Sequence, residues 1–153
     1  MTQPETQTEV EAAEFASGDD APLVGIVMGS ESDREVMQKA GTELESRGIS
    51  YEIQVMSAHR SPDLVATYAK DARSRGLRII IAGAGLSAAL PGVVAAHTDL
   101  PVIGVPLAAK TGVMNGLDAL LSVAQMPPGV PVACVGVDNA RNAAVLAARI
   151  LGA

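Results

Sequence analysis

The run Leu77-Arg78-Ile79-Ile80-Ile81-Ala82, followed by Gly83-Ala84-Gly85, decides the fold class of this chain of 153 residues. Five of its first six residues are apolar, and three of them are isoleucines, which favours a strand. A strand with apolar residues on both faces is typical of a parallel sheet that helices cover on both sides. The glycines that follow predict a turn at the carboxyl end of this strand.

Four more strand-like runs and five helical stretches alternate along the chain. We predict strands at 23–28, 51–55, 77–82, 102–105 and 132–137. We predict helices at 34–47, 62–75, 88–97, 116–125 and 139–151. This βα alternation predicts an α/β fold with a parallel five-stranded sheet, right-handed crossovers and a helical layer on each face.

The ends of the first two helices carry recognisable signals. A capping box from Ser32 to Glu35 begins the first helix, with Ser30 as the alternative cap, and Gly48 ends it. The pair Ser61-Pro62 begins the second helix as an N-cap followed by a proline in the first helical position, and Gly76 ends it.

The composition bounds the class of protein. The chain is 48% hydrophobic, which is enough for the core of one domain, and its apolar runs are too short to span a membrane. A pI of about 4.8, no basic stripe and only three aromatic residues argue against a nucleic-acid partner.

The residue types show no metal-ligand spacing, so we expect no metal. The single cysteine, Cys134, is expected to be a buried small hydrophobe, and a cytoplasmic location fits.

The acidity is concentrated at the amino terminus. Residues 1–20 hold six acidic residues and no lysine or arginine: Glu5, Glu9, Glu11, Glu14, Asp19 and Asp20. We therefore predict a disordered acidic tail over residues 1–21 and a single folded domain over residues 22–153.

The strongest functional signal is Ser57-Ala58-His59-Arg60, between the second strand and the second helix. In open α/β sheets, ligands bind at the carboxyl ends of the strands. An imidazole exchanges protons near neutral pH, and a guanidinium suits phosphate or carboxylate. We expect His59 and Arg60 to belong to a functional site.

Three other loops follow strands. Residues 29–33 predict either an anion site at a helix N-terminus or a plain capped helix. Residues 83–88 match the dinucleotide fingerprint G-x-G-x-x-A, but they lie outside the first βα turn and no acidic residue ends the next strand. We interpret them as a glycine-lined wall that a flat ligand can approach. The loop with Lys110 is either a flap or a solvated loop.

Together these motifs resemble the class I N5-carboxyaminoimidazole ribonucleotide (N5-CAIR) mutase family of purine biosynthesis, over about residues 23–151. They are GSESD (29–33), SAHRSP (57–62), AGAG (82–85), LPG (90–92), PVIGVP (101–106), GLDALLS (116–122) and QMP (125–127). The resemblance implies a flavodoxin-like three-layer α/β/α sandwich. It also implies a homo-octamer with sites between subunits, no cofactor, and a ribonucleotide substrate from an upstream N5-CAIR synthetase.

The resemblance also implies a reaction and its residues. N5-CAIR becomes 4-carboxyaminoimidazole ribonucleotide (CAIR) by decarboxylation and recarboxylation, with His59 as the catalytic proton shuttle. Matches to the family's phosphate contacts are Ser32, Ser57 and Arg60; Asp33 matches its ribose ligand and Ser30 its contact to the base. The rest of the substrate-binding set is Ala58, Gly83, Gly85, Ala88 and Leu90.

The chain departs from the family pattern at several positions. Leu86, Ser87 and Ala89 stand where the family usually has Gly, Ala and a second His, and Arg34 replaces a frequent Trp. Three alternatives stay open: a carboxylase that uses free carbon dioxide and aminoimidazole ribonucleotide (AIR), a non-catalytic nucleotide-binding protein, and a paralogue with another substrate. The alanine stripe of the last helix predicts close packing, on its own sheet or on another subunit.

Overall fold

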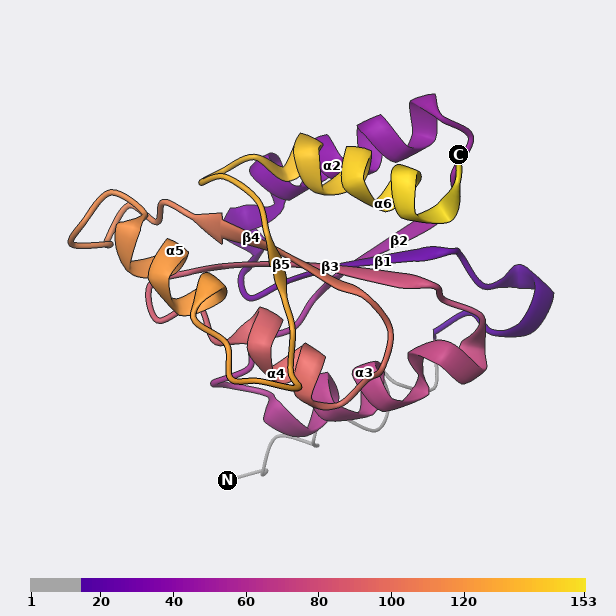
Figure 1. The fold of residues 1–153 in the computed structure, drawn as a ribbon, viewed down its shortest axis with the longest axis horizontal. Coiled ribbons are helices and arrows are strands. Elements are labelled where there is room, and N and C mark those ends of the chain that lie inside the picture. Colours follow the sequence, from indigo (N-terminus) through magenta and orange to yellow (C-terminus); the bar gives the residue numbers. More distant parts are fainter. Residues whose placement is uncertain (1–14) are drawn as a thin grey trace, which may run out of the picture.

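Five parallel strands form the central sheet of the computed structural model, which describes residues 15–153 (Figure 1). The strands are β1 (Val24–Met28), β2 (Tyr51–Val55), β3 (Ile79–Gly85), β4 (Val102–Leu107) and β5 (Ala133–Cys134). Their order in the sheet, β2-β1-β3-β4-β5, is the flavodoxin-like order. The predicted five-stranded parallel sheet is confirmed.

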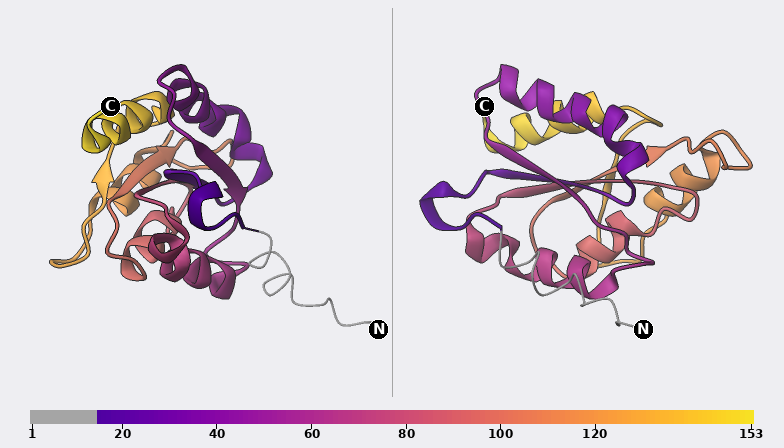
Figure 2. Two further views of the ribbon diagram at one scale, coloured as in Figure 1. Left: turned by 90° about the vertical axis from the view of Figure 1, so that its right-hand side faces the viewer. Right: turned by 180° about the vertical axis from the view of Figure 1, so that it is seen from behind.

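Helices cover both faces of this sheet (Figures 1 and 2). One layer holds α2 (Arg34–Ser46) and α6 (Ala140–Leu151). The other holds α3 (Pro62–Arg75), α4 (Leu90–Ala96) and α5 (Leu117–Ala124). The described residues also form two short 3₁₀ helices, η1 (Gly18–Asp20) and η2 (Glu31–Asp33). Within these residues, no helix is long and apolar enough to cross a bilayer.

The alanine stripe of α6 faces the protein's own core. Its members are all fully buried: Ala140, Ala143, Ala144, Ala147 and Ala148. They share a core cluster with residues of β1, β3, β4 and α2. Because the side chains are small, α6 can lie close to both the sheet and α2. Of the two packing modes predicted for this stripe, packing on its own sheet is therefore correct.

The predicted capping box at the start of α2 is wrong. The Ser30 hydroxyl accepts a hydrogen bond from the Ser32 backbone N–H (3.3 Å) and so caps η2. Asp33 takes the N-cap position of α2, with no side-chain capping bond. The reason is that the chain first makes a 3₁₀ turn, which places Ser32 inside that turn. At the end of α3, Gly76 is left-handed (φ 114°), as predicted.

Strand lengths differ from the prediction at the carboxyl edge of the sheet. β3 continues to Gly85, because Gly83, Ala84 and Gly85 still pair with residues 105–107 of β4. A Cβ at Gly83 would lie 2.4 Å from the sulfur of Met37, so glycine there lets α2 pack on the strand. β5 comprises only Ala133–Cys134 instead of 132–137. It is an edge strand with one neighbour, and the chain turns at Asp138 (φ 58°), so regular pairing ends early.

Residues 15–21 pack against α3, so the packed part of the chain begins before residue 22. The Phe15 ring meets the Tyr68 ring edge-on, with 5.1 Å between centroids. The Arg75 guanidinium lies 4.9 Å from the centre of the Phe15 ring, and its Nε donates a hydrogen bond to the Ala16 carbonyl (2.8 Å). Residues 1–14 of the predicted tail lie outside the described residues.

A buried ion pair joins β2 to α3 at the same place. Arg75 is only 8% exposed, and its Nη2 lies 2.8 and 2.9 Å from the two carboxylate oxygens of Glu52. The Tyr68 hydroxyl donates to the same carboxylate at 2.8 Å. Burial, and then the charge of Glu52, raises the pKa of Tyr68 well above its ordinary value, so the phenol keeps its proton and remains a donor.

We expect Glu52→Ala to lower the free energy of unfolding by about 3–5 kcal/mol, because it leaves the Arg75 guanidinium buried without its carboxylate. The matched control is Asp99→Ala. It breaks the Asp99–Arg73 pair, whose side chains are 79% and 61% exposed, and should cost at most about 1 kcal/mol. Urea unfolding of both variants measures the difference. Equal losses in the two variants would contradict a structural role for the buried pair.

Candidate active site

The carboxyl ends of β1, β2 and β3 lie side by side. Met28, the last residue of β1, pairs with Val55 of β2 on one side and with Gly83 of β3 on the other. The Met56 backbone N–H also donates to the Met28 carbonyl at 2.8 Å. The loops that carry the predicted site residues therefore leave the sheet from adjacent positions.

The loop after β1 presents two hydroxyl groups together. The Ser30 and Ser32 Oγ atoms are 2.9 Å apart and share a hydrogen bond. Ser30 is half-buried and Ser32 is exposed. Neighbouring hydroxyls at the start of a helical segment can donate hydrogen bonds to an anion or to a polar ring substituent.

The loop after β2 is a tight turn with two exposed functional side chains. The Ser61 N–H donates to the Ser57 carbonyl (2.8 Å), and the Arg60 N–H donates to the Ser57 hydroxyl (3.2 Å). Ala58 packs against the core beneath this turn. His59 and Arg60 are exposed. The turn thus presents an imidazole and a guanidinium on the loop that leaves the sheet next to the loop of Ser30 and Ser32.

Of the two arginines near these loops, Arg60 is the one available to an anion. Arg34 donates from Nε and Nη2 to both carboxylate oxygens of Glu31, which lowers the pKa of Glu31. Within residues 15–153, no carboxylate pairs with Arg60. Its guanidinium fork is therefore free for a phosphate or carboxylate.

The loop after β3 presents the exposed side chains of Leu86 and Ser87, and its other residues offer mainly backbone to a ligand. Ala88 and Leu90 are each only 2% exposed, and both belong to the core. A Cβ at Gly85 would lie 3.0 Å from the Ala109 Cβ, so this glycine allows the loop after β4 to approach. Packing therefore explains why Gly83 and Gly85 are glycines, while their backbone atoms still lie at the site.

Asp33 is the half-buried carboxylate of the site. Burial raises the pKa of Asp33, and the nearby charge of Asp138 raises it further, while a backbone hydrogen bond from Ser30 opposes both effects. The unliganded protein therefore bears a cost for keeping this carboxylate ionised. Acceptor oxygens of this kind suit the hydroxyl groups of a sugar.

Two cavities border these loops. One of about 380 Å³ is lined by residues that include Glu31, Arg34 and Gln54. Another of about 310 Å³ lies between Leu86 and Ser87 after β3 and residues 111–122. Within residues 15–153, no group of three or more His, Cys, Asp or Glu residues is arranged to hold a metal ion.

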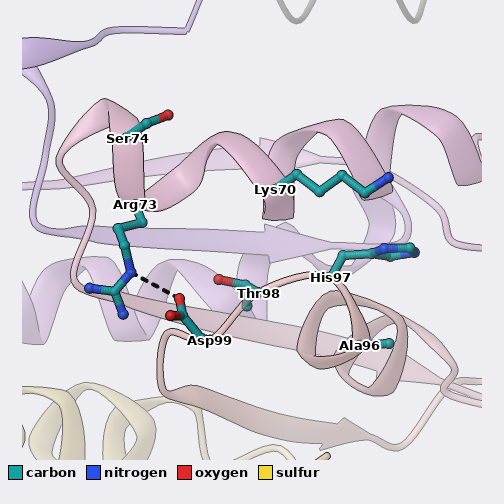
Figure 3. A pocket seen from close by; sticks show the side chains of 7 residues that line it. All are labelled: Lys70, Arg73, Ser74, Ala96, His97, Thr98 and Asp99. Carbon is teal, nitrogen blue, oxygen red and sulfur yellow. Dashed lines mark hydrogen bonds and ion pairs between the residues drawn. The ribbon is translucent and has the colours of Figure 1, made fainter.

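A further cavity, of about 620 Å³, lies away from this edge of the sheet (Figure 3). Lys70, Arg73 and His97 are among its lining residues, on the last turns of α3 and the end of α4. These segments lead into the amino ends of β3 and β4. His97, the second histidine of the chain, is therefore separated from His59 by the length of the sheet.

Asp138 was given no role in the sequence analysis. It follows β5 at the same edge of the sheet, and its side chain bonds the loop after β4. The signal was present, because Asp138 is the acidic residue nearest the carboxyl end of the last strand. Cys134, expected to be buried, is half-buried, and burial raises the pKa of its thiol.

A family model described as AIR carboxylase matches residues 23–153. The chain belongs to the AIR carboxylase family. Among curated relatives, the N5-carboxyaminoimidazole ribonucleotide mutase of Thermotoga maritima is 60% identical over 131 residues, which are 86% of this chain and 75% of that protein. The mutase of Pyrococcus horikoshii is 59% identical over 131 residues, 86% of this chain and 73% of that protein.

Family members also share the fold. A crystal structure of Treponema denticola PurE superimposes with a TM-score of 0.75 and 36% identity, covering 86% of this chain and 80% of that one. The flavodoxin-like sandwich implied by the sequence resemblance is thus confirmed.

We expect Asp33→Asn to raise the melting temperature of the unliganded protein at pH 7. The variant replaces a carboxyl group whose ionised form is disfavoured in the folded state. Since the folded-state pKa is raised, this penalty is present above that pKa and fades as the pH falls through it. The gain should therefore vanish in acid. Asp71→Asn, on the exposed face of α3, is the control for the loss of a surface carboxylate. A lower melting temperature for Asp33→Asn at pH 7 would contradict the assignment.

Proposed function

We propose that this protein is an N5-carboxyaminoimidazole ribonucleotide mutase, an isomerase of de novo purine (IMP) biosynthesis. The observation that carries the proposal is the placement of His59. It is exposed on the tight turn after β2, directly before Arg60, and this turn follows the strand that pairs with β1, whose own loop carries Ser30 and Ser32. Relatives 59% and 60% identical carry the mutase name.

In this proposal His59 moves one proton in each half of the reaction. The bond between the exocyclic nitrogen and the carboxylate carbon breaks, carbon dioxide leaves, and the imidazolium gives its proton to that nitrogen. Carbon 4 of the ring then attacks carbon dioxide, and the neutral imidazole takes the proton that carbon 4 loses. The net result is a moved carboxylate, with no oxidant, reductant or cofactor consumed. A histidine can act as acid and base near neutral pH.

The other residues position the nucleotide. We assign the 5′-phosphate to Arg60 with the hydroxyls of Ser32 and Ser57, because a guanidinium and two hydroxyls on adjacent loops supply the charged and neutral hydrogen-bond donors that a phosphate needs. Asp33 accepts hydrogen bonds from the ribose hydroxyls, and Ser30, deeper in the loop, faces the base. Backbone atoms of residues 83–90 form the wall that retains carbon dioxide.

Sequence similarity favours the mutase over a carboxylase that uses free carbon dioxide. Two relatives named as mutases are 59% and 60% identical to this chain, whereas the phosphoribosylaminoimidazole carboxylase of Schizosaccharomyces pombe is 54% identical. The proposal includes an upstream N5-CAIR synthetase as the source of substrate, and a cytoplasmic location.

His59→Asn should reduce turnover by about 100- to 10,000-fold while leaving nucleotide binding intact, because it removes the proton donor without removing a phosphate contact. Conversion of N5-CAIR to CAIR measures turnover, and calorimetry with AIR measures binding. His97→Asn is the matched control and should keep the parent's activity. The role fails if His59→Asn turns over within a few-fold of the parent.

An apolar face beside the site supports assembly. It comprises large side chains that remain substantially exposed: Leu86 (47%), Val113 (89%), Met114 (53%), Leu117 (41%) and Leu121 (52%). A soluble monomer seldom exposes so much apolar surface in one place. We propose that this face contacts other copies of the chain in a homo-octamer, with the site completed between subunits. The number eight comes from the family resemblance.

Leu121→Glu should lower the particle mass and the activity together, because a carboxylate would be buried at the subunit contact. Leu23→Glu is the control, since Leu23 is also exposed (38%) but lies at the amino end of β1. Light scattering and the turnover assay are run on the same samples. A fully active parent that is monomeric, with a mass near 15.6 kDa, would rule out a shared site.

A further inference from the structure

Asp138 connects the loop after β5 to the end of β4 and to the loop that follows β4, with one hydrogen bond to each. Its backbone N–H donates to the Pro106 carbonyl at 2.8 Å. Its carboxylate Oδ1 accepts from the Ala108 N–H at 3.0 Å. Asp138 also has a left-handed backbone (φ 58°), a conformation that few side chains tolerate well.

We propose that Asp138 is a positioning residue that holds the loop of residues 108–116 against the substrate site. This inference rests on the mutase function proposed above and goes beyond it, because it gives a task to a residue outside the predicted site. We call the two hydrogen bonds to Pro106 and Ala108 the clasp.

The clasp acts on the site through Ala109. Leu107 pairs with Gly85 at the ends of β4 and β3. The space that a Cβ of Gly85 would occupy is taken by the Ala109 Cβ at 3.0 Å and the Leu107 carbonyl at 3.1 Å. Because Ala109 follows Ala108 directly, holding the Ala108 N–H also holds the residue that backs the β3 wall.

The far end of the same loop is held by the neighbour of Asp138. A Cβ at Gly116 would lie 2.7 Å from the Val137 Cγ1 and 3.2 Å from the Ala108 Cβ. Gly116 is itself left-handed (φ 93°) and precedes α5. Residues 137 and 138 thus fix both ends of a loop whose middle, around Lys110, is exposed.

Asp138 also lies near the first loop of the site, since its charge contributes to the raised pKa of Asp33. The clasp therefore holds a loop that contacts Gly85, at the end of the strand that we assign to the wall retaining carbon dioxide. An open loop would let carbon dioxide escape after the first half of the reaction. The enzyme would then release AIR, the intermediate whose exocyclic nitrogen has taken up the proton, instead of CAIR.

The test compares Asp138→Gly with Asp138→Asn. Both residues accept a left-handed backbone, so neither variant adds strain to the fold. Glycine removes the Oδ1 acceptor, whereas asparagine keeps an amide oxygen for the Ala108 N–H. The matched control is Asn139→Ala, which removes the Asn139 cap of α6 (3.1 Å to the Asn142 N–H) but leaves the clasp intact.

Two readouts are measured on each full-length protein. The first is the ratio of AIR to CAIR formed from N5-CAIR, corrected for decay without enzyme. The second is the rate of tryptic cleavage after Lys110, followed by mass spectrometry. Asp138→Gly should raise the AIR fraction and speed cleavage at Lys110 about fivefold, as expected for the loss of one hydrogen bond. Asp138→Asn and Asn139→Ala should behave like the parent.

The proposal is overturned if Asp138→Gly gives the same ratio of AIR to CAIR and the same rate of cleavage after Lys110 as the parent. It is also overturned if Asp138→Asn is as impaired as Asp138→Gly, because the charge and not the hydrogen bond would then matter. If the parent converts no N5-CAIR, the mutase function fails, yet cleavage at Lys110 still tests the clasp by itself.

Discussion

Parallel pairing of β1 with a neighbour on each side is the constraint on which the rest of the structure depends. Met28 is bonded between Val55 and Gly83, so the loops after β1, β2 and β3 must leave the sheet next to one another. All of the proposed catalytic and phosphate-binding groups lie on the first two of these loops. Parallel strands require crossover helices, and these helices also bury both faces of the sheet.

Three arginines differ in whether a carboxylate of the protein binds them. Arg75 is buried and bonded to both oxygens of Glu52, at the end of α3 that is farther from the site. Arg34 is held by Glu31 beside the site. Arg60 has no such carboxylate partner within the described residues. Arg75 and Arg34 are thus each held by a carboxylate of the protein, whereas the guanidinium on the His59 turn is available to a ligand.

Several features that lower the stability of the folded protein lie at the carboxyl edge of the sheet. Within residues 15–153, the non-glycine residues with a left-handed backbone all follow β3, β4 or β5: Leu86, Ala88, Asn115 and Asp138. The half-buried Asp33 carboxylate and the apolar face lie at the same edge. Strain, a disfavoured charge and exposed apolar surface persist where binding or assembly can offset them. The opposite end of the sheet shows no left-handed residue other than glycine within the described residues.

The sequence by itself determined the succession of strands and helices, because apolar periodicity and local signals such as Ser61-Pro62 and Gly76 act over a few residues. It also indicated the loop of His59, since residue types at a strand end are local information. Only the tertiary structure decided that β5 is a two-residue edge strand and that α6 buries its alanines in its own core. Likewise, only packing showed that Gly83 makes room for Met37 and that Asp138 reaches Ala108. These contacts join residues about 30 or more positions apart, and no local pattern specifies which distant side chain fills a given space.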